Sequence, residues 1–389
     1  MAFFDSKNFN AEVYGKYLEE LLDYNMNLLL SSGAIKERPD YAALLRDQVG
    51  GHYATFPIKD RIGGKPVNYD GKTDIPATNR ETYTHSLIVK GDAIGWTELD
   101  FSTDITGGED FMPAAQEQAD FWRDYNQNVL LAVLKGMFRM SGGKNGVNDD
   151  FVESHTYREG KFNEITVNNA AQKALGDQKN AFNLLIVHSA VATHLENLGL
   201  VEYKKWTDPN GVETDITLAT INGRTILIDD GMPVEPAEER YERVKPQSLE
   251  AFDALRVVAE SAGDGEIALE DVEEDIADIK VGEYVKKYVS EPVYTSYLLG
   301  LNSIEFVNCG AKVPVEVWRD PAKNGGLSVL YNRQRVSFSA PGISYTDNTK
   351  ISPELEDLEN GANWAIDSGE GDAHYPLKGI RLVQIKTRG

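Results

Sequence analysis

The chain has 389 residues, with 39 Lys and Arg against 62 Asp and Glu, which gives a formal net charge of −23. Apolar residues make up 41% of the sequence, enough to bury sizeable cores, so composition excludes a disordered chain. The longest apolar runs are far shorter than the roughly 20 residues that cross a bilayer, so a membrane protein is not expected. At about 100–200 residues per domain, two or three folded units are predicted.

The acidic balance and the single cysteine, Cys309, exclude further classes of protein. Tight binding of phosphates needs concentrated Lys and Arg, so a protein that mainly neutralises nucleic acid is not expected. One cysteine permits no internal disulfide and no Cys-rich zinc or iron–sulfur site. Residues 1–6 lack a basic region leading into a long apolar stretch, so no secretory signal is expected and a reducing cytoplasm fits.

The first hundred residues predict a helix followed by an extended hairpin. Helical spacing after Asn10 predicts an amphipathic helix that stops near Gly33. Strand and turn patterns then fill residues 50–104 and predict a β-hairpin with its tip at residues 60–80. The tip has too few large apolar residues to form its own core, so it is either a surface loop or ordered by another chain. On the returning strand, one face carries Tyr83, His85, Leu87 and Val89.

A long helix is predicted from Asp110 to Met140, with Pro113 in its first turn and one continuous apolar stripe. At about 1.5 Å per residue it would be about 45 Å long, longer than the usual globular helix. The stripe contains Ala115, Ala119, Trp122, Val129 and Val133. This length suggests a structural spine.

The residues that follow predict a compact α/β unit. A short helix over 167–176 precedes a buried strand that runs directly into a helix over 189–198, with Ser189 as its N-cap. Two strands are joined by Asn222-Gly223, the strongest short hairpin signal. Ser352-Pro353 begins a short helix, and residues 380–387 form a closing strand.

Residues 235–291 differ from their surroundings and suggest an inserted, solvent-facing subdomain. Leu249–Ala262 is predicted to be helical, and Asp264–Asp278 carries eight carboxylates. A calcium-binding EF-hand loop needs an oxygen ligand at position 5 and Gly at position 6. Counted from Asp264, those positions hold Ala268 and Leu269, so a solvated charged face is the better interpretation.

The sequence predicts no catalytic, cofactor-binding or metal-ligating residues, and hence no enzyme and no cofactor. His188 and His194 are six residues apart and lie on different sides of a helix, which makes them poor co-ligands. Asp229, Asp230 and Glu316 offer carboxylates for a metal-dependent hydrolase, but nothing in the sequence brings them together.

Short segments in a fixed order along nearly the whole chain are typical of one known family. They are Met1–Tyr17, Gln48–Gly51, Ile62–Gly71, Trp96–Gly108, Val187–Leu195, Asn222–Pro233, Tyr294–Gly300, Val315–Asp320 and Asn363-Trp364. In these segments the chain resembles the major capsid (coat) proteins of tailed bacteriophages, whose Johnson fold is shared with encapsulin shells. It is most similar to the coat proteins of phages and prophages of gut Firmicutes. Residues 235–291 are an insertion relative to the family pattern.

The resemblance implies an α+β fold, the tailed-phage major capsid (Johnson) fold, with five parts. These are an N-terminal arm (1–50), an extended β-hairpin loop that clasps an adjacent subunit (51–105), a peripheral domain with the spine helix (106–182), an axial α/β domain with the acidic insertion 235–291 (183–330), and a return to the peripheral domain (331–389).

The same resemblance implies a structural protein that self-assembles, as pentamers and hexamers, into the icosahedral shell of a virion. The shell would enclose double-stranded DNA without sequence-specific binding and without a membrane. Expected partners are a separate scaffolding protein, a portal, and a capsid protease or decoration proteins, with assembly in the bacterial host cytoplasm. The alternatives are an encapsulin-like compartment that holds a cargo enzyme, the metal-dependent hydrolase, and a small-ligand-binding surface protein.

Overall fold

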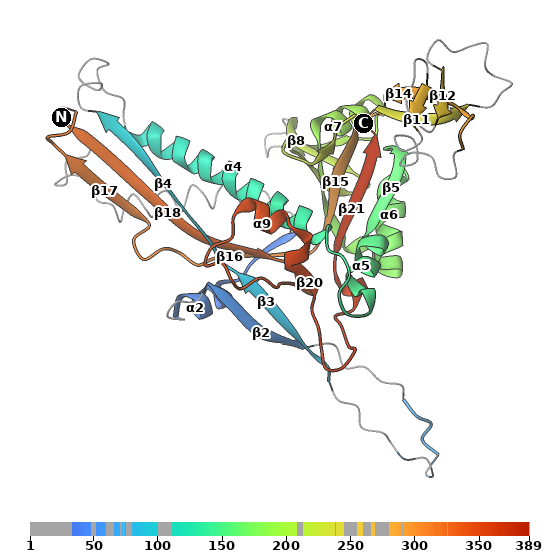
Figure 1. Cartoon of the computed structure of the whole chain (residues 1–389). Helices are drawn as coiled ribbons and strands as arrows, with labels where there is room; N and C mark the ends of the chain where they lie inside the picture. Colours follow the sequence, from blue (N-terminus) through green and yellow to red (C-terminus); the bar gives the residue numbers. More distant parts are fainter. Residues whose placement is uncertain are drawn as a thin grey trace.

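The computed structural model mixes helices and strands in three projections that meet at a common centre (Figure 1). The predicted helix after Asn10 and most of the hairpin tip lie outside the described residues. No helix among the described residues is long and apolar enough to cross a membrane. The structure describes residues 33–47, 52–59, 66–70, 72, 74, 80–99, 111–207, 213–237, 239–244, 255–259, 266–268, 280–289, 291–324 and 326–388.

The first projection is a long, narrow sheet built around β18 (Leu327–Ser339). One edge of β18 pairs antiparallel with β4 (Lys90–Leu99) from Leu327↔Leu99 to Val336↔Lys90. The other edge pairs with β17 and β16, and β16 pairs parallel with β1. The bounds are β1 (Ile35–Glu37), β16 (Ile304–Asn308) and β17 (Val315–Asp320), and α2 (Pro39–Asp47) lies next to β16. We call the strands β4, β17 and β18 the arm (Figure 1).

The second projection is the predicted α/β unit. Its sheet has the order β5-β21-β15-β6-β9-β8-β7, with β10 on β15. The strands are β5 (Thr156–Lys161), β6 (Phe182–Val187), β7 (Glu202–Thr207), β8 (Glu213–Ile221), β9 (Arg224–Ile228), β10 (Val234–Glu235), β15 (Val293–Gly300) and β21 (Leu382–Arg388). The helices are α5 (Val147–His155), α6 (Thr166–Leu175) and α7 (Ser189–Asn197). Asn222 and Gly223 have φ of 49° and 77°, the left-handed values of a type I′ hairpin turn, so the predicted β8–β9 hairpin is confirmed.

The chain crosses between these two sheets several times. Strands β16 to β18 follow β15 in sequence but belong to the sheet that contains β4. Strands β5 and β21, which lie far from each other in sequence, belong to the sheet that contains β15. Residues from the ranges 106–182, 183–330 and 331–389 therefore occur together in one sheet, that of β5, β15 and β21. A peripheral and an axial role for those ranges stays a prediction.

The predicted long helix is α4 (Phe111–Met137), 27 residues and about 40 Å long. Ala119, Trp122, Val129 and Val133 of the predicted stripe are 1–2% exposed. The C-terminal half of α4 lies in the largest core cluster, which contains side chains from both main sheets, such as Tyr297 of β15. This one helix therefore packs in a core shared by the arm and the α/β unit, and its role as a structural spine stays a prediction.

The third projection is the hairpin of β2 (Tyr53–Lys59) and β3 (Thr82–Ile88), which pair antiparallel as the sequence predicts. Tyr83, His85 and Leu87 of β3 are at most 2% exposed, which confirms the inward face. His85 Nδ1 lies 2.9 Å from Asp367 Oδ2, and both side chains are fully buried. The Ser344 hydroxyl donates to the other carboxylate oxygen at 2.5 Å. The base of the hairpin is thus fixed to β19 (Ile343–Tyr345) and to the residue after β20 (Trp364–Ile366).

Residues of the insertion form a separate sheet of order β11-β14-β12-β13. Its strands are β11 (Glu239–Val244), β12 (Leu255–Ala259), β13 (Glu266–Ala268) and β14 (Tyr284–Val289). The predicted helix over Leu249–Ala262 is wrong at β12. There the β-branched Val257 and Val258 favour a strand. β12 pairs with the distant β14 over Leu255–Val257 and with β13 over Val257–Ala259, and Val258 is completely buried.

The N-cap prediction for α7 is also wrong by one residue. His188, in extended conformation (φ −71°, ψ 150°), precedes the helix, and its Nδ1 accepts the Ala190 N–H at 3.1 Å. Ser189 is already helical. Asx and hydroxyl side chains are the usual N-caps, so the sequence rule favoured the serine over the imidazole.

His155, at the end of α5, is the buried group with the clearest consequence for pH. It is 1% exposed and stacks on Phe151 at a ring distance of 4.5 Å. Burial lowers the pKa of His155 from 6.5 to about 4. The unfolded chain therefore takes up a proton below pH 6.5 that the folded protein rejects until about pH 4, and stability falls as pH decreases through this window.

We expect His155→Leu to remove this pH dependence. Between pH 7 and pH 5 the wild-type free energy of unfolding should fall by about 2 kcal/mol more than that of the variant. Urea unfolding of both proteins at the two pH values measures the difference, because the other titrating groups are shared and cancel. Parallel losses in the two proteins would contradict this role for His155.

Candidate interaction surfaces

The three carboxylates of the hydrolase interpretation do not come together. Asp229 and Asp230 follow β9 in the α/β sheet, and Asp229 Oδ2 accepts from Gln127 Nε2 of α4 at 2.5 Å. Glu316 lies on β17 in the other sheet and forms an ion pair with Arg333 at 3.0 Å. Within the part of the chain that the structure describes, no group of three His, Cys, Asp or Glu side chains is placed to hold a metal ion.

Asp230 lies instead beside the start of α7. A hydrogen bond from Ser189 lowers the pKa of Asp230, and His188 Nε2 lies 4.0 Å from its Oδ1. The His188 ring also contacts Tyr294 of β15 at a centroid distance of 4.9 Å. His188 caps α7 through its other nitrogen, so these contacts hold together the ends of β6 and β9, which are parallel neighbours.

An aromatic cluster fixes the N-terminal half of α4 to the arm. The Trp96 and Phe121 rings pack edge to face at 5.8 Å, and Trp122 packs edge to face on Tyr125 at 5.9 Å. The Tyr125 hydroxyl donates to Asp92 Oδ1 at 2.9 Å. Such pairs add about 0.5–1.5 kcal/mol each beyond burial of their area. Phe121 keeps 40% of its surface exposed.

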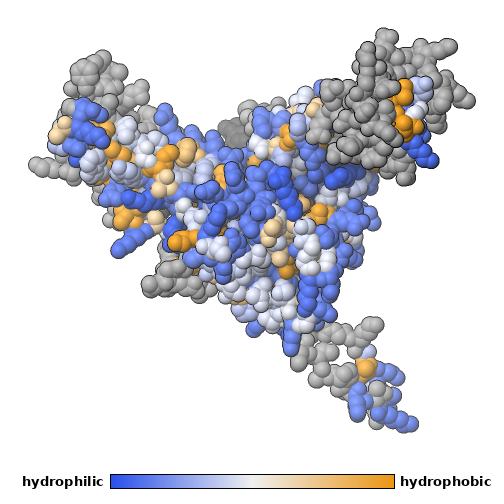
Figure 2. Space-filling view, viewed as in Figure 1, coloured by the Kyte–Doolittle hydropathy of each residue, from blue (hydrophilic) through white to orange (hydrophobic). Residues whose placement is uncertain are grey.

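The opposite face of the arm carries large exposed side chains. The register pairs Trp318 with Val329, and Tyr331 with Gly95. Because strand side chains alternate, these positions lie on the face that Trp96 does not share. Trp318 and Tyr331 are 46% and 38% exposed. The space-filling view shows hydrophobic residues at several places on this arm (Figure 2). Exposed aromatic groups of this kind are typical of protein interfaces.

The far end of the hairpin is the most exposed apolar feature of the described residues. The segment 66–70 stands well away from the body of the molecule (Figure 1). Tyr69 is 89% exposed and Val67 is 38% exposed. Within this segment the Asp70 N–H donates to the Asn68 carbonyl at 3.1 Å.

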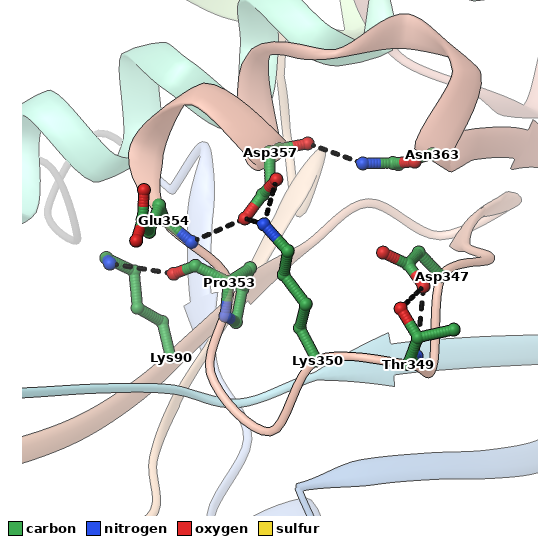
Figure 3. Close-up of polar contacts among 8 residues, drawn as sticks. All are labelled: Lys90, Asp347, Thr349, Lys350, Pro353, Glu354, Asp357 and Asn363. Atoms are coloured by element: carbon green, nitrogen blue, oxygen red, sulfur yellow. Dashed lines mark hydrogen bonds and ion pairs between the residues drawn. The ribbon is translucent and has the colours of Figure 1, made fainter.

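A C-terminal strap, residues 346–363, crosses the base of the arm and is fixed by ion pairs and hydrogen bonds (Figure 3). The buried Lys90 Nζ donates to the Pro353 carbonyl at 2.9 Å. Lys350 pairs with Asp357 at 2.7 Å, and Asp357 Oδ2 accepts the Glu354 N–H at 2.9 Å. Glu354 and Asp357 form a capping box on α9 (Leu355–Glu359), the short helix predicted to begin at Ser352-Pro353.

The sequence did not predict which exposed aromatics gather on one face. Alternation along residues 315–320 and 327–339 was the available signal, but it does not say which strands are neighbours. Tyr69 lies in the tip that the sequence did predict to lack its own core.

Comparisons with known proteins show capsid chains among similar structures. A chain of the acidic stable capsid structure of Helicobacter pylori bacteriophage KHP30 aligns with TM-score 0.47 and 11% identity, over 92% of this chain and 87% of that one. A chain of the capsid of Ralstonia phage GP4 aligns with TM-score 0.47 and 10% identity over the same fractions. The cyanophage Pam1 capsid aligns with TM-score 0.44 and 10% identity, over 91% and 88%. No family model and no curated protein sequence matches the chain.

Proposed function

We propose that this chain is the major capsid protein of a tailed phage, a structural subunit with the Johnson fold that self-assembles into an icosahedral shell. One observation carries the proposal: a hairpin anchored by a buried His85–Asp367 pair extends away from the subunit and presents Tyr69 at 89% exposure. A rigid base with an exposed apolar end is the geometry of a segment that packs on another chain. The ordered sequence segments that resemble phage coat proteins support the same conclusion.

The distribution of exposed apolar side chains also fits an assembling subunit. Tyr69 lies at the end of the hairpin, whereas Trp318 and Tyr331 lie on the arm. Different patches on separate projections favour head-to-tail contacts, in which one surface of a subunit binds another surface of its neighbour. Such contacts close into rings, here pentamers and hexamers, and the rings close into a shell.

The charge of the chain fits a container for double-stranded DNA. With a net charge of −23, the subunit encloses DNA without holding each phosphate tightly or reading its sequence. We assign it to the virion capsid, assembled in the host cytoplasm with a separate scaffolding protein, a portal, and a protease or decoration proteins. The sequence segments favour the coat-protein type of gut Firmicutes phages.

Within this proposal, residues 1–50 are the N-terminal arm, a different segment from the arm of β4, β17 and β18. Residues 51–105 are the extended loop that clasps a neighbour. Residues 106–182 and 331–389 belong to the peripheral domain, and 183–330 to the axial domain. The acidic insertion 235–291 lies on the exterior of the shell. The encapsulin-like alternative shares the shell but differs in its contents, so particles that hold a cargo protein in place of DNA would favour it.

The hairpin end gives a direct test of the proposal. Tyr69→Ser should leave the free energy of unfolding of the isolated subunit in urea unchanged within about 0.5 kcal/mol, because a surface substitution removes no internal contact. It should reduce the yield of assembled particles at least about tenfold, since a buried interface tyrosine is worth more than about 1.4 kcal/mol. Particle yield is measured by light scattering and electron microscopy.

Ile351→Ser is the matched control. Ile351 is 77% exposed on the C-terminal strap, so this change removes a comparably exposed apolar side chain from the body of the subunit. Assembly of this variant should match the wild type. Equal particle yields from Tyr69→Ser and the wild type would contradict the role of the hairpin.

A further inference from the structure

Arg224, the first residue of β9, is a buried cation without a carboxylate partner. Only 6% of its surface is exposed. Its Nη1 donates a long hydrogen bond, 3.3 Å, to Asn168 Oδ1, and its buried Nε has no hydrogen-bond partner. No described carboxylate forms an ion pair with it. Burial lowers the pKa of Arg224, and no neighbouring carboxylate offsets that effect.

A buried guanidinium without a counter-charge lowers the stability of the folded subunit. Arg is almost never fully buried unless it is paired, because removing a charge from water without a counter-charge costs several kcal/mol. The flat guanidinium with its five donors matches the two oxygens of a carboxylate or a phosphate. The orphaned Nε is thus evidence for a missing oxyanion.

The surroundings of Arg224 favour an anion. Asn168, whose Oδ1 accepts the hydrogen bond from Arg224 Nη1, lies in the first turn of α6, a helix of 10 residues. The positive end of a helix dipole attracts negative charge. At this helix start Asn163 Oδ1 already accepts the Ile165 and Thr166 N–H groups, so the donor left without a partner is the Nε of Arg224.

One exposed apolar side chain adjoins this place. Ile165 immediately precedes α6 and is 51% exposed. The Asn222 side chain donates a 3.4 Å hydrogen bond to the carbonyl of Glu164, the residue before Ile165. We call Ile165, Asn222 and Arg224 the Arg224 edge.

We propose that the Arg224 edge binds a second copy of this chain, which supplies a carboxylate to the Arg224 guanidinium. The occupant follows from charge complementarity: each copy carries 62 acidic against 39 basic side chains, so a neighbour offers many carboxylates. A half-exposed apolar side chain beside a charge pair, here Ile165, would help to exclude water from it, as in the centre of an interface. This inference rests on the proposed assembly function and names one of its contacts.

Arg224→Leu tests the proposal because subunit stability and assembly should move in different directions. Leucine removes a buried charge, so the urea midpoint of the isolated subunit should stay the same or rise. Assembly should need at least about tenfold more protein, because a desolvated charge pair is lost. Arg224→Lys, which keeps the charge, should assemble better than Arg224→Leu. Arg158→Leu is the control, since it removes the same charge from an exposed position on β5.

The outcomes separate the alternatives. A lower urea midpoint for Arg224→Leu would show that the guanidinium is needed inside the subunit and would overturn the proposal. Wild-type assembly by Arg224→Leu would also overturn it. Inorganic phosphate that raises the melting temperature of the wild-type subunit, but not of Arg224→Leu, would then identify a free anion as the ligand. If the wild type forms no assemblies, the proposed function fails. If phosphate also leaves the melting temperature of the wild-type subunit unchanged, the oxyanion site at Arg224 is overturned as well.

Discussion

Replacing Gly136 by alanine should destabilise the subunit by about 3 kcal/mol or more, at the upper end of the cost of overpacking. A Cβ at this position of α4 would lie 1.9 Å from the Leu358 carbonyl oxygen and 2.5 Å from Trp364 Nε1. These two atoms are themselves joined by a hydrogen bond of 2.8 Å, so neither can move away without breaking it. The backbone oxygen belongs to α9, and a shift would displace the C-terminal strap.

Urea unfolding of the isolated subunit measures this effect, and Gly160→Ala is its control. Gly160 lies on β5 with no atom within 4 Å of an added Cβ, so the free energy of unfolding of this variant should change by less than about 0.5 kcal/mol. Gly136→Ala should in addition lower particle yield, because α4 joins the arm to the α/β unit. A wild-type midpoint for Gly136→Ala would show that α4 and α9 do not approach as closely as described.

The second large effect is expected at the buried His85–Asp367 pair. His85→Leu should lower the free energy of unfolding by about 3–5 kcal/mol, because it leaves the fully buried Asp367 carboxylate with only the Ser344 hydroxyl as a described side-chain partner. Urea unfolding measures the loss. The double variant His85→Leu with Asp367→Leu should recover most of it, since replacing both partners of a buried polar pair by apolar groups is often neutral.

His374→Ala is the control for this pair. His374 is exposed and bonds only locally, to the Tyr375 carbonyl, so its loss should cost less than about 0.5 kcal/mol. The same anchor holds the base of the hairpin, so His85→Leu should also make the subunit assemble poorly. A cost below about 1 kcal/mol for His85→Leu would contradict the anchor.

Local patterns predicted the elements that local physics determines. The stripe of α4, the alternation that buries Tyr83 and His85, and the Asn222-Gly223 turn all depend on residues close in sequence. A helical or strand period of this kind is visible without knowing the neighbours. The same limit explains the error at β12, where pairing with the distant β14 outweighed a helical pattern.

The candidate sites depend on contacts between distant residues, which the sequence does not contain. Arg224 meets Asn168 across 56 positions, and Glu316 turns to Arg333 and not to Asp229. Nothing in the sequence brought the three hydrolase carboxylates together, so that interpretation was already doubtful, but no sequence pattern could reveal an arginine without a carboxylate partner. An orphaned Nε is recognised only when every neighbour of the guanidinium is known.

Negative-stain electron microscopy of the purified protein, with light scattering on the same fraction at rising concentrations, tests the central claim most directly. The assembly account predicts closed icosahedral shells or capsomer-sized rings. A particle of one subunit's mass, 43.1 kDa, at every concentration would contradict it.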